Sequence, residues 1–331
     1  GHLVIAQALE RALGEAGHDA ALLYTPEAGF GTMASAYWST WRTDPSRAHG
    51  GRSVDQVITL RFPSYAVRHP RQVCWLNHRM REYYDVWEQF HAALSWRNQL
   101  KERARRRVVH TVDRQLLTRN VDRVFAQSKT IQARLLRWGG IAAEVLYPPP
   151  PQRAYRCDGY GDFLFVVSRL THLKRIGLVV DALAHPDAAG VRCLIAGDGE
   201  EQPALRARID ELGLGGRVSL LGRLPEAAVL EHLARCRAVC FPPLREDYGF
   251  VTSEAFASRK AVITCSDSGG PAELVESGVN GLVTAPTAPA LAAAIRTVMG
   301  DVALAERYGT AGADVAGRLT WEETVSRLVL V

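Results

Sequence analysis

Short apolar runs alternate with helical patterns along the second half of the chain. The runs have the length and composition of buried β-strands and lie at residues 162–170, 191–197, 218–222, 238–243, 261–265 and 281–285. Between consecutive runs, apolar residues recur at the spacing of an amphipathic helix. Strict alternation of strand and helix predicts an α/β fold, a parallel sheet with helices on both faces. Ligands of such folds bind at the carboxyl ends of the strands.

The first half of the chain follows a similar but less regular pattern. A helix is predicted over residues 3–17 and a long helical stretch over residues 87–119. Strand-like runs lie at residues 19–25, 56–60, 72–76, 123–128 and 143–148. The chain opens on a helix, whereas a doubly wound domain normally opens on a strand and a loop that lead into that helix. Either the first strand is missing from this chain or the N-terminal sheet is one strand short.

The clearest boundary is a run of four prolines at residues 148–151. Proline cannot continue a helix or a central strand, and consecutive prolines favour extended polyproline II, which is a stiff connector. At 331 residues the chain is also too long for one ordinary core. We therefore expect one domain over residues 1–150 and a second that begins at residue 151.

Composition indicates a soluble globular protein, since 47% of the residues are hydrophobic and 23% are charged. No apolar run approaches the roughly 20 residues that cross a bilayer, and residues 1–30 lack the pattern of a signal peptide. The six cysteines form no CxxC pair, and Cys193, Cys240 and Cys265 lie in strand-like runs. This pattern is typical of buried free thiols in a reducing compartment, so we expect a cytoplasmic protein.

The net charge of +5 is unevenly distributed along the chain. Residues 1–150 hold 21 Lys and Arg against 13 Asp and Glu, whereas residues 151–331 hold 19 against 22. The basic excess is densest in Trp96–Arg107, which has no signature of a nucleic-acid-binding module, and we expect no nucleic-acid partner. A solvated helix face is the first interpretation. Failing that, a basic face suits an anionic membrane surface or a phosphorylated acceptor.

Common cofactor and hydrolase motifs are absent from the chain. Gly197 and Gly199 begin a dinucleotide-like pattern, but Gln202 stands at the third glycine position and an acidic pair opens the helix. An acidic pair would repel a pyrophosphate, which argues against an NAD enzyme. No P-loop, GxSxG or HExxH sequence occurs, so nothing indicates a nucleotide triphosphatase, a serine hydrolase or a metalloprotease.

Charged and glycine-rich segments follow successive strands of the second half. Arg169 and Lys174 follow the first strand, residues 245–249 follow the fourth, and residues 267–271 follow the fifth. Because parallel strands end at one edge of a sheet, these segments are expected to converge. Cations offset a diphosphate, backbone N–H groups at a helix start accept phosphate oxygens, and carboxylates accept sugar and ribose hydroxyls. Together they predict a nucleotide-sugar site.

The second half resembles a known family. The segments "SRLTHLKR", "VSLLGRL", "PPLREDYGFVTSEAF" and "SDSGGPAELVESGVNGLV" are similar in order and spacing to the donor domain of retaining glycosyltransferases of family 4, over nearly all of residues 160–331. Their E-x7-E signature corresponds to Glu246 and Glu254. The first half is similar more loosely. The resemblance implies the GT-B fold, in which two Rossmann-like, doubly wound parallel-sheet domains face a cleft, with a donor domain over residues 151–317. The final segment, residues 318–331, is similar to the family's terminal helix, which packs back on the first domain.

The resemblance also implies an activity. Such enzymes transfer a sugar from a nucleoside-diphosphate sugar, here a UDP- or GDP-sugar, with retention of anomeric configuration and with no metal or other cofactor. The acceptor would be a sugar, a lipid-linked sugar or a glycan in cell-envelope glycoconjugate or polysaccharide synthesis, with the enzyme in the cytoplasm or at the inner face of the membrane.

Four residues carry the catalytic roles that the resemblance implies. Arg169 and Lys174 would hold the diphosphate, and Glu246 would bind sugar hydroxyls beside the reacting carbon. His78 matches the family's histidine near the donor sugar, although a packed or surface histidine is the competing interpretation. A diphosphate leaving group needs positive charge where negative charge develops, so the two cations would be the main catalytic groups.

The resemblance assigns further residues to donor binding. They are Gly222, Arg223, Leu224, Asp247, Gly249, Phe250, Val251 and Glu254. The backbone of residues 222–224 would meet the base, the amides of Phe250 and Val251 would cap the β-phosphate, and Glu254 would hold the ribose.

The chain departs from the family pattern at three places, and two other functions compete. The opening strand and glycine-rich acceptor loop are absent from the sequence, which favours as an alternative a truncated or non-catalytic nucleotide-sugar-binding module. Arg259 stands where glycine is common, and a left-handed conformation there would cost about 1 kcal/mol. Arg175 also replaces a glycine and adds a charge near the phosphates. A sugar-nucleotide epimerase of similar architecture is the other alternative.

Overall fold

The chain forms two units that are connected near the proline run. The computed structural model describes residues 2–25 and 32–330. Unit 1 is Gly1–Pro148 together with Thr320–Val331, and unit 2 is Pro149–Leu319. The last helix, α13 (Trp321–Leu328), therefore belongs to unit 1 although it follows unit 2 in the sequence. The functions expected of the two domains stay predictions.

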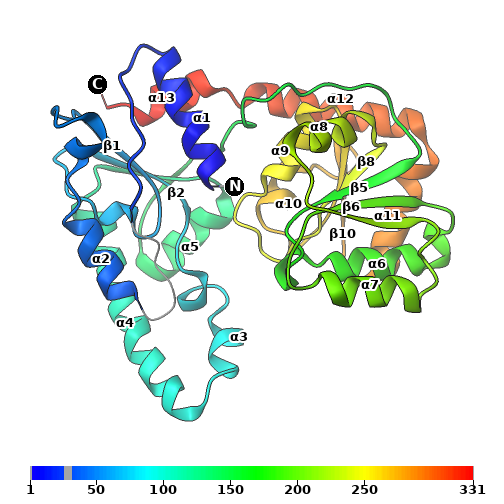
Figure 1. Cartoon of the computed structure of the whole chain (residues 1–331), viewed down its shortest axis with the longest axis horizontal. Helices are drawn as coiled ribbons and strands as arrows, with labels where there is room; N and C mark the ends of the chain where they lie inside the picture. The colour runs from blue at the N-terminus through cyan, green and yellow to red at the C-terminus, as the bar shows by residue number, and fades with distance from the viewer. Residues whose placement is uncertain (1, 26–31, 331) are drawn as a thin grey trace. The chain divides into compact units, whose positions relative to one another are not determined.

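Unit 2 is built on a sheet of six parallel strands (Figure 1). The strands are β5 (Phe163–Val167), β6 (Arg192–Ala196), β7 (Val218–Gly222), β8 (Ala238–Cys240), β9 (Ala261–Cys265) and β10 (Gly281–Thr284). Their spatial order is β10-β9-β8-β5-β6-β7, which is the doubly wound order. The chain reverses its direction of winding between β5 and β8, so a ligand crevice is expected at the carboxyl ends of these two strands.

Helices cover both faces of this sheet, as the alternating pattern predicts. They are α6 (Ile176–Ala184), α7 (Gln202–Glu211), α8 (Glu226–Arg235), α9 (Phe250–Ala257), α10 (Gly270–Leu274), α11 (Ala288–Gly300) and α12 (Val302–Arg318), with 3-10 turns η4 (His172–Lys174) and η5 (Pro186–Ala188). Figure 1 shows α6 and α7 on one side of the sheet and α8 and α9 on the other. Because both faces are covered, all of β9 is buried.

Five of the six cysteines are buried, and all six are free thiols. The three in strand-like runs, Cys193, Cys240 and Cys265, lie in β6, β8 and β9. Burial raises the pKa of the Cys193 thiol to about 12, so it stays protonated at neutral pH.

No single helix among the described residues is long and apolar enough to cross a membrane. One bent pair, Ala288–Gly300 with Val302–Leu328, passes by length and composition alone.

Unit 1 contains a four-stranded parallel sheet in the order β1-β2-β3-β4. Its strands are β1 (Val57–Arg61), β2 (Gln72–His78), β3 (Arg123–Ala126) and β4 (Glu144–Val145). Its helices besides α13 are α1 (His2–Glu15), α2 (Met33–Trp41), α3 (Trp87–Ala92), α4 (Trp96–Arg119) and α5 (Lys129–Gly139), with 3-10 turns η1 (Pro45–His49), η2 (Ser64–Ala66) and η3 (Arg81–Tyr83). The predicted long helix is therefore two helices, because Ser95 adopts an extended conformation (φ −62°, ψ 153°) between them.

The predicted strand over residues 19–25 does not form. A cavity of about 1060 Å³ lies beside this segment and is lined by it, by one face of α1 and by β1. A β-strand needs a neighbouring backbone to pair with, and the Leu22 amide instead donates to Glu10 Oε1 of α1 at 3.2 Å. The apolar run in this segment was therefore a misleading strand signal.

Side-chain caps define where several helices begin. The side chains of Ser128, Asp301 and Thr320 accept from the backbone amide three residues later, at the starts of α5, α12 and α13. Such caps satisfy N–H groups that have no acceptor within the helix.

A buried aspartate organises the core of unit 1. Asp113 on α4 is fully buried and accepts from the hydroxyls of Tyr37, Tyr65 and Tyr84. The bonds from Tyr65 and Tyr84 measure 2.5 and 2.6 Å. These tyrosines come from α2, η2 and the end of η3, so one carboxylate connects three segments to α4. Burial is the largest cause that raises the pKa of Tyr84, and the Asp113 charge is the second.

Replacing this carboxylate should destabilise unit 1 strongly. Asp113→Ala leaves three buried hydroxyls without their acceptor, and each unsatisfied group costs about 1–3 kcal/mol. The matched variant Tyr37→Phe removes a single donor and should lower the free energy of unfolding by about 1 kcal/mol. Urea denaturation measures both. Equal destabilisation by the two variants would contradict a cooperative role for Asp113.

Candidate functional site

Two loops at the carboxyl edge of the unit 2 sheet pack backbone against backbone. The Glu246 amide donates to Ser268 O at 2.9 Å, and the Gly270 amide donates to Glu246 O at 3.0 Å. A Cβ atom on Gly269 would lie 2.3 Å from Glu246 O, and Gly269 has φ 71°. Only glycine therefore allows this close approach. The contact fixes the backbone of Glu246 at the end of β8.

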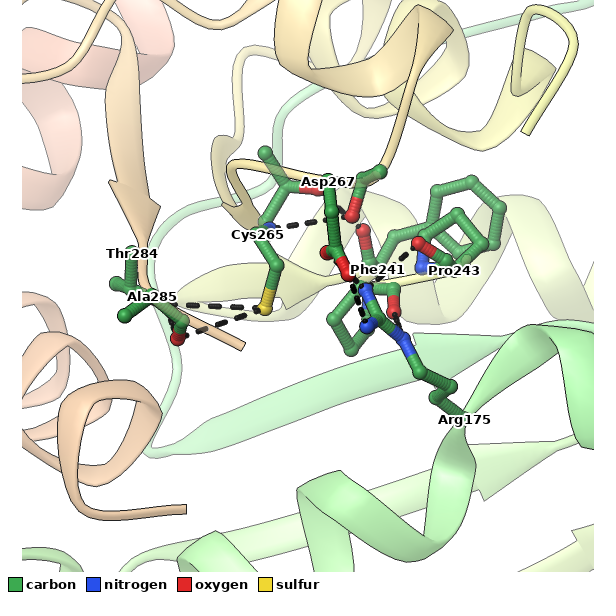
Figure 2. Close-up of polar contacts among 10 residues, drawn as sticks. Arg175, Phe241, Pro243, Cys265, Asp267, Thr284 and Ala285 are labelled. Atoms are coloured by element: carbon green, nitrogen blue, oxygen red, sulfur yellow. Dashed lines mark hydrogen bonds and ion pairs between the residues drawn. The ribbon is translucent and has the colours of Figure 1, made fainter. Parts of the chain in front are cut away.

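Arg175 connects a third loop to these two (Figure 2). Its Nη1 and Nη2 atoms donate to the two carboxylate oxygens of Asp267 at 2.8 and 2.6 Å. Its Nε and Nη2 atoms also donate to the carbonyls of Pro242 and Pro243, each at 2.8 Å. The positive charge of Arg175, which stands where the family commonly has glycine, is thus paired with the Asp267 carboxylate. That Arg175 lies near the phosphates of a donor stays a prediction.

Arg175 holds these contacts from a left-handed backbone. Its φ is 51°, and Arg259 is also left-handed with φ 56°. Both positions match the expected places where the family commonly has glycine. The bidentate pair of Arg175 offsets a backbone cost on the order of 1 kcal/mol.

Lys174 and Glu246 lie together, as expected of two residues in one site. Lys174 Nζ contacts Glu246 Oε2 at 2.6 Å and lies 5.5 Å from the centre of the Phe241 ring. The two charged side chains are only 12% and 19% exposed, so water screens the pair incompletely. The ammonium therefore holds the carboxylate at the junction of β5 and β8.

Arg169 follows β5 and is exposed. Within the described residues its side chain makes no ion pair or hydrogen bond. The base-side segment begins at Gly222, which ends β7 with φ 68°. Arg223 after it is exposed, and Leu224 is half-buried.

Gly249 directs the start of α9. It has φ 81°, and a Cβ atom there would lie 2.7 Å from Pro271 Cγ and 2.9 Å from Phe241 Cε1. Phe250 and Val251 form the first turn of the helix, where backbone amides have no acceptor inside the helix. These amides and the helix dipole favour an anion at this position. Asp247 is half-buried in the loop that leads to this turn.

Glu254 is buried on α9 and has two partners that the sequence did not indicate. Its Oε1 atom accepts from Arg153 Nη1 and from the Tyr155 hydroxyl, the latter at 3.3 Å. Burial raises the pKa of Glu254, and the Arg153 charge opposes this most strongly. Arg153 and Tyr155 lie just after the proline run, in a segment without periodicity. The only signal in the sequence is that a charged and an aromatic residue stand close to the connector.

His78 ends β2 and so belongs to unit 1, whereas the other candidate residues belong to unit 2. Its role at the donor sugar stays a prediction. Across residues 2–25 and 32–330, no group of three His, Cys, Asp or Glu side chains could hold a metal ion.

The fold class follows from the two units. Each is built on a parallel sheet, and the second is doubly wound, with Lys174 and Glu246 at its switch point. This fold class is GT-B, an α/β architecture of glycosyltransferases. Residues 155–315 match the family model for glycosyl transferases group 1. Sucrose-phosphate synthase from Thermosynechococcus elongatus superposes with a TM-score of 0.77 at 19% identity, over 99% of this chain and 91% of that one.

Two further proteins share more sequence with the chain. Anabaena HepE, solved in complex with UDP and glucose, is 26% identical with a TM-score of 0.59, over 66% of this chain and 65% of that one. An exopolysaccharide phosphotransferase of Streptomyces coelicolor is 33% identical over 180 residues, which are 51% of this chain and 19% of the relative. The chain thus spans about a fifth of the length of that curated relative.

The backbone contact at Gly269 yields a stability test. Gly269→Ala must move the Glu246 backbone as well as adopt a left-handed conformation. Gly278→Ala is the matched control, because Gly278 has φ 85° but open space around it. The control should cost about 1 kcal/mol, and Gly269→Ala about 1–3 kcal/mol more. Urea denaturation measures the difference, and equal costs would contradict the tight contact.

Proposed function

We propose that the protein is a retaining glycosyltransferase of family 4, a hexosyltransferase that moves a sugar from a UDP- or GDP-sugar to a sugar, lipid-linked or glycan acceptor. The observation that carries this proposal is the meeting of Lys174, Glu246 and the start of α9 at the switch point between β5 and β8. The group 1 family match and the UDP and glucose bound by HepE support it. Synthesis of a cell-envelope glycoconjugate or polysaccharide is the process we assign to it.

The donor would lie along the carboxyl edge of the sheet. Arg169 and Lys174 pair with the diphosphate, and the amides of Phe250 and Val251 donate to its β-phosphate. Glu246 accepts hydroxyls of the sugar, which places the sugar beside Lys174. Residues 222–224 meet the base, with Asp247 and Gly249 shaping the sugar side of the site.

Charge stabilisation is the catalytic contribution of these residues. As the bond from sugar to diphosphate breaks, negative charge grows on the leaving oxygen. Lys174, which is paired with Glu246, and the α9 amides are held at this edge of the sheet before the reaction, so they stabilise the charge with little reorganisation. The exposed Arg169 adds its positive charge when it pairs with the diphosphate. Retention follows if the acceptor attacks from the leaving-group face. The donor diphosphate then needs no metal, and His78 of unit 1 would contribute beside the sugar.

Calorimetric titration with UDP and GDP tests the assignment. Arg169→Ala should weaken binding of the preferred nucleotide about tenfold or more, since it removes a charge-assisted contact. Glu246→Ala should abolish sugar transfer, measured as release of nucleoside diphosphate, yet leave nucleotide affinity within a few-fold, because Glu246 meets the sugar.

Arg206→Ala is the matched control, since Arg206 is exposed on α7 away from the strand ends. No nucleotide binding by the wild type, or unchanged binding by Arg169→Ala, would refute the donor site. Conversion of the donor sugar without an acceptor would indicate an epimerase instead.

We also propose that α4 rests on an anionic membrane at the inner face. All of its acidic residues, Glu102 and Asp113, are buried and accept from tyrosine hydroxyls. Its exposed face carries the basic residues Arg97, Lys101, Arg103 and Arg107. Trp96, Leu100 and Val108 on the same face are 67%, 59% and 61% exposed. Apolar residues among cations are typical of helices that lie at a lipid interface.

Vesicle sedimentation tests this surface. The wild type should bind vesicles that contain phosphatidylglycerol and not those of phosphatidylcholine alone, with binding weakened by salt. Trp96→Ser with Leu100→Ser should reduce binding about tenfold or more, because both side chains lose apolar burial. Leu136→Ser on α5, a position 64% exposed, is the matched control. Equal binding to both vesicle types would refute the proposal.

A further inference from the structure

The carboxylate assigned to the ribose is held by the segment that follows the proline run. Arg153 Nη1 and the Tyr155 hydroxyl both donate to Glu254 Oε1. Arg153 is itself anchored, because its Nη2 atom contacts Glu226 Oε2 on α8 at 2.9 Å. A segment outside the sheet thus fixes the orientation of a side chain on α9.

The two oxygens of Glu254 are used differently. Oε1 takes both donors, whereas no residue in the described part of the chain donates to Oε2. We propose that Arg153 and Tyr155 are positioning residues, which orient Glu254 so that Oε2 accepts a ribose hydroxyl of the bound nucleotide. This inference rests on the proposed function, since it assumes that Glu254 meets the ribose.

The surroundings of Glu254 explain why it needs such partners. The Glu254 side chain is 11% exposed, and burial raises its pKa. Among the described residues, the charged or titratable groups that act on it are Arg153, Tyr155 and Glu226, and Arg153 opposes the effect of burial most strongly. Burial and the Glu254 charge raise the pKa of Tyr155, so its hydroxyl keeps its proton and donates. Without Arg153, Glu254 would accept a proton more readily and lose an acceptor for the ribose.

In a competing interpretation, Arg153 is a latch, which means that its pairing with Glu254 occupies the nucleotide site and must be displaced before the nucleotide binds. Two features favour positioning. The guanidinium has a second acceptor in Glu226, and both donors to Glu254 converge on the same oxygen. The two interpretations predict opposite effects when Arg153 is removed, because loss of a latch strengthens nucleotide binding.

The experiment compares ribonucleotides with their 2′-deoxy analogues. UDP and GDP, each with its 2′-deoxy form, are titrated into the full chain by calorimetry. The wild type should prefer the ribonucleotide about tenfold, and Arg153→Met should lose most of that preference. Arg153→Lys should restore part of it by keeping the charge, and Tyr155→Phe, which is isosteric, should lower it several-fold. Ribonucleotide affinity of Arg153→Met should also fall more steeply than that of the wild type as the pH is lowered, because Glu254 then takes up a proton more readily.

Two further variants make the outcomes distinct. Arg156→Met is the matched control, because Arg156 lies in the same segment but pairs with Asp158 and Glu231 at the surface. Glu254→Gln tests the role of Glu254 itself.

If Glu254→Gln loses the ribose preference while Arg153→Met and Tyr155→Phe keep it, the positioning role is wrong and the proposed function stands. Tighter binding by Arg153→Met would establish the latch instead. If Glu254→Gln keeps the preference, Glu254 does not meet the ribose and both assignments fail. Absence of nucleotide binding by the wild type would overturn the proposed function itself.

Discussion

The close packing of the loop after β8 against the loop after β9 is the constraint on which the candidate site depends. Gly269 admits the carbonyl of Glu246 where any side chain would collide with it. That contact sets the backbone of Glu246, which places its carboxylate beside Lys174. The same loop continues to Gly249, where Pro271 and Phe241 also leave no room for a side chain, and this close packing fixes the start of α9. Backbone geometry therefore comes first, and the charged side chains follow from it.

Three ion pairs of the described chain cross the switch point of the unit 2 sheet, and in each the cation lies on the β5 side and the carboxylate on the side of β8 and β9. The cations Arg153, Lys174 and Arg175 come from just before β5 or just after it, and their partners Glu254, Glu246 and Asp267 come from beyond β8 or β9. Each pair is electrically balanced and joins the two halves of the sheet. Arg169 is different, because its side chain makes no ion pair or hydrogen bond in the described structure. An incoming diphosphate can therefore pair with Arg169 without first breaking an ion pair.

The sequence predicted what periodicity and chain order determine. Parallel strands end at one edge, so the convergence of Lys174, residues 245–249 and residues 267–271 could be foreseen and is seen in the structure. The partners of Glu254 could not, because Arg153 and Tyr155 lie in an irregular segment whose path depends on tertiary packing. The same limit explains the missing strand at residues 19–25. Its apolar run had the length of a strand, but pairing needs a neighbouring backbone, and a cavity separates it from β1.

The orientation of α4 connects the core of unit 1 to its surface. Asp113 and Glu102 lie on the buried face of the helix, where tyrosine hydroxyls from other segments hold them. Because a helix is rigid about its own axis, fixing these two acids also fixes which residues face outward. Trp96, Leu100 and the arginines around them are exposed for this reason, although helical periodicity of apolar residues would have turned such side chains inward. Buried carboxylates, which cost free energy to desolvate unless they are hydrogen-bonded, are therefore what gives this helix a surface that is both basic and apolar.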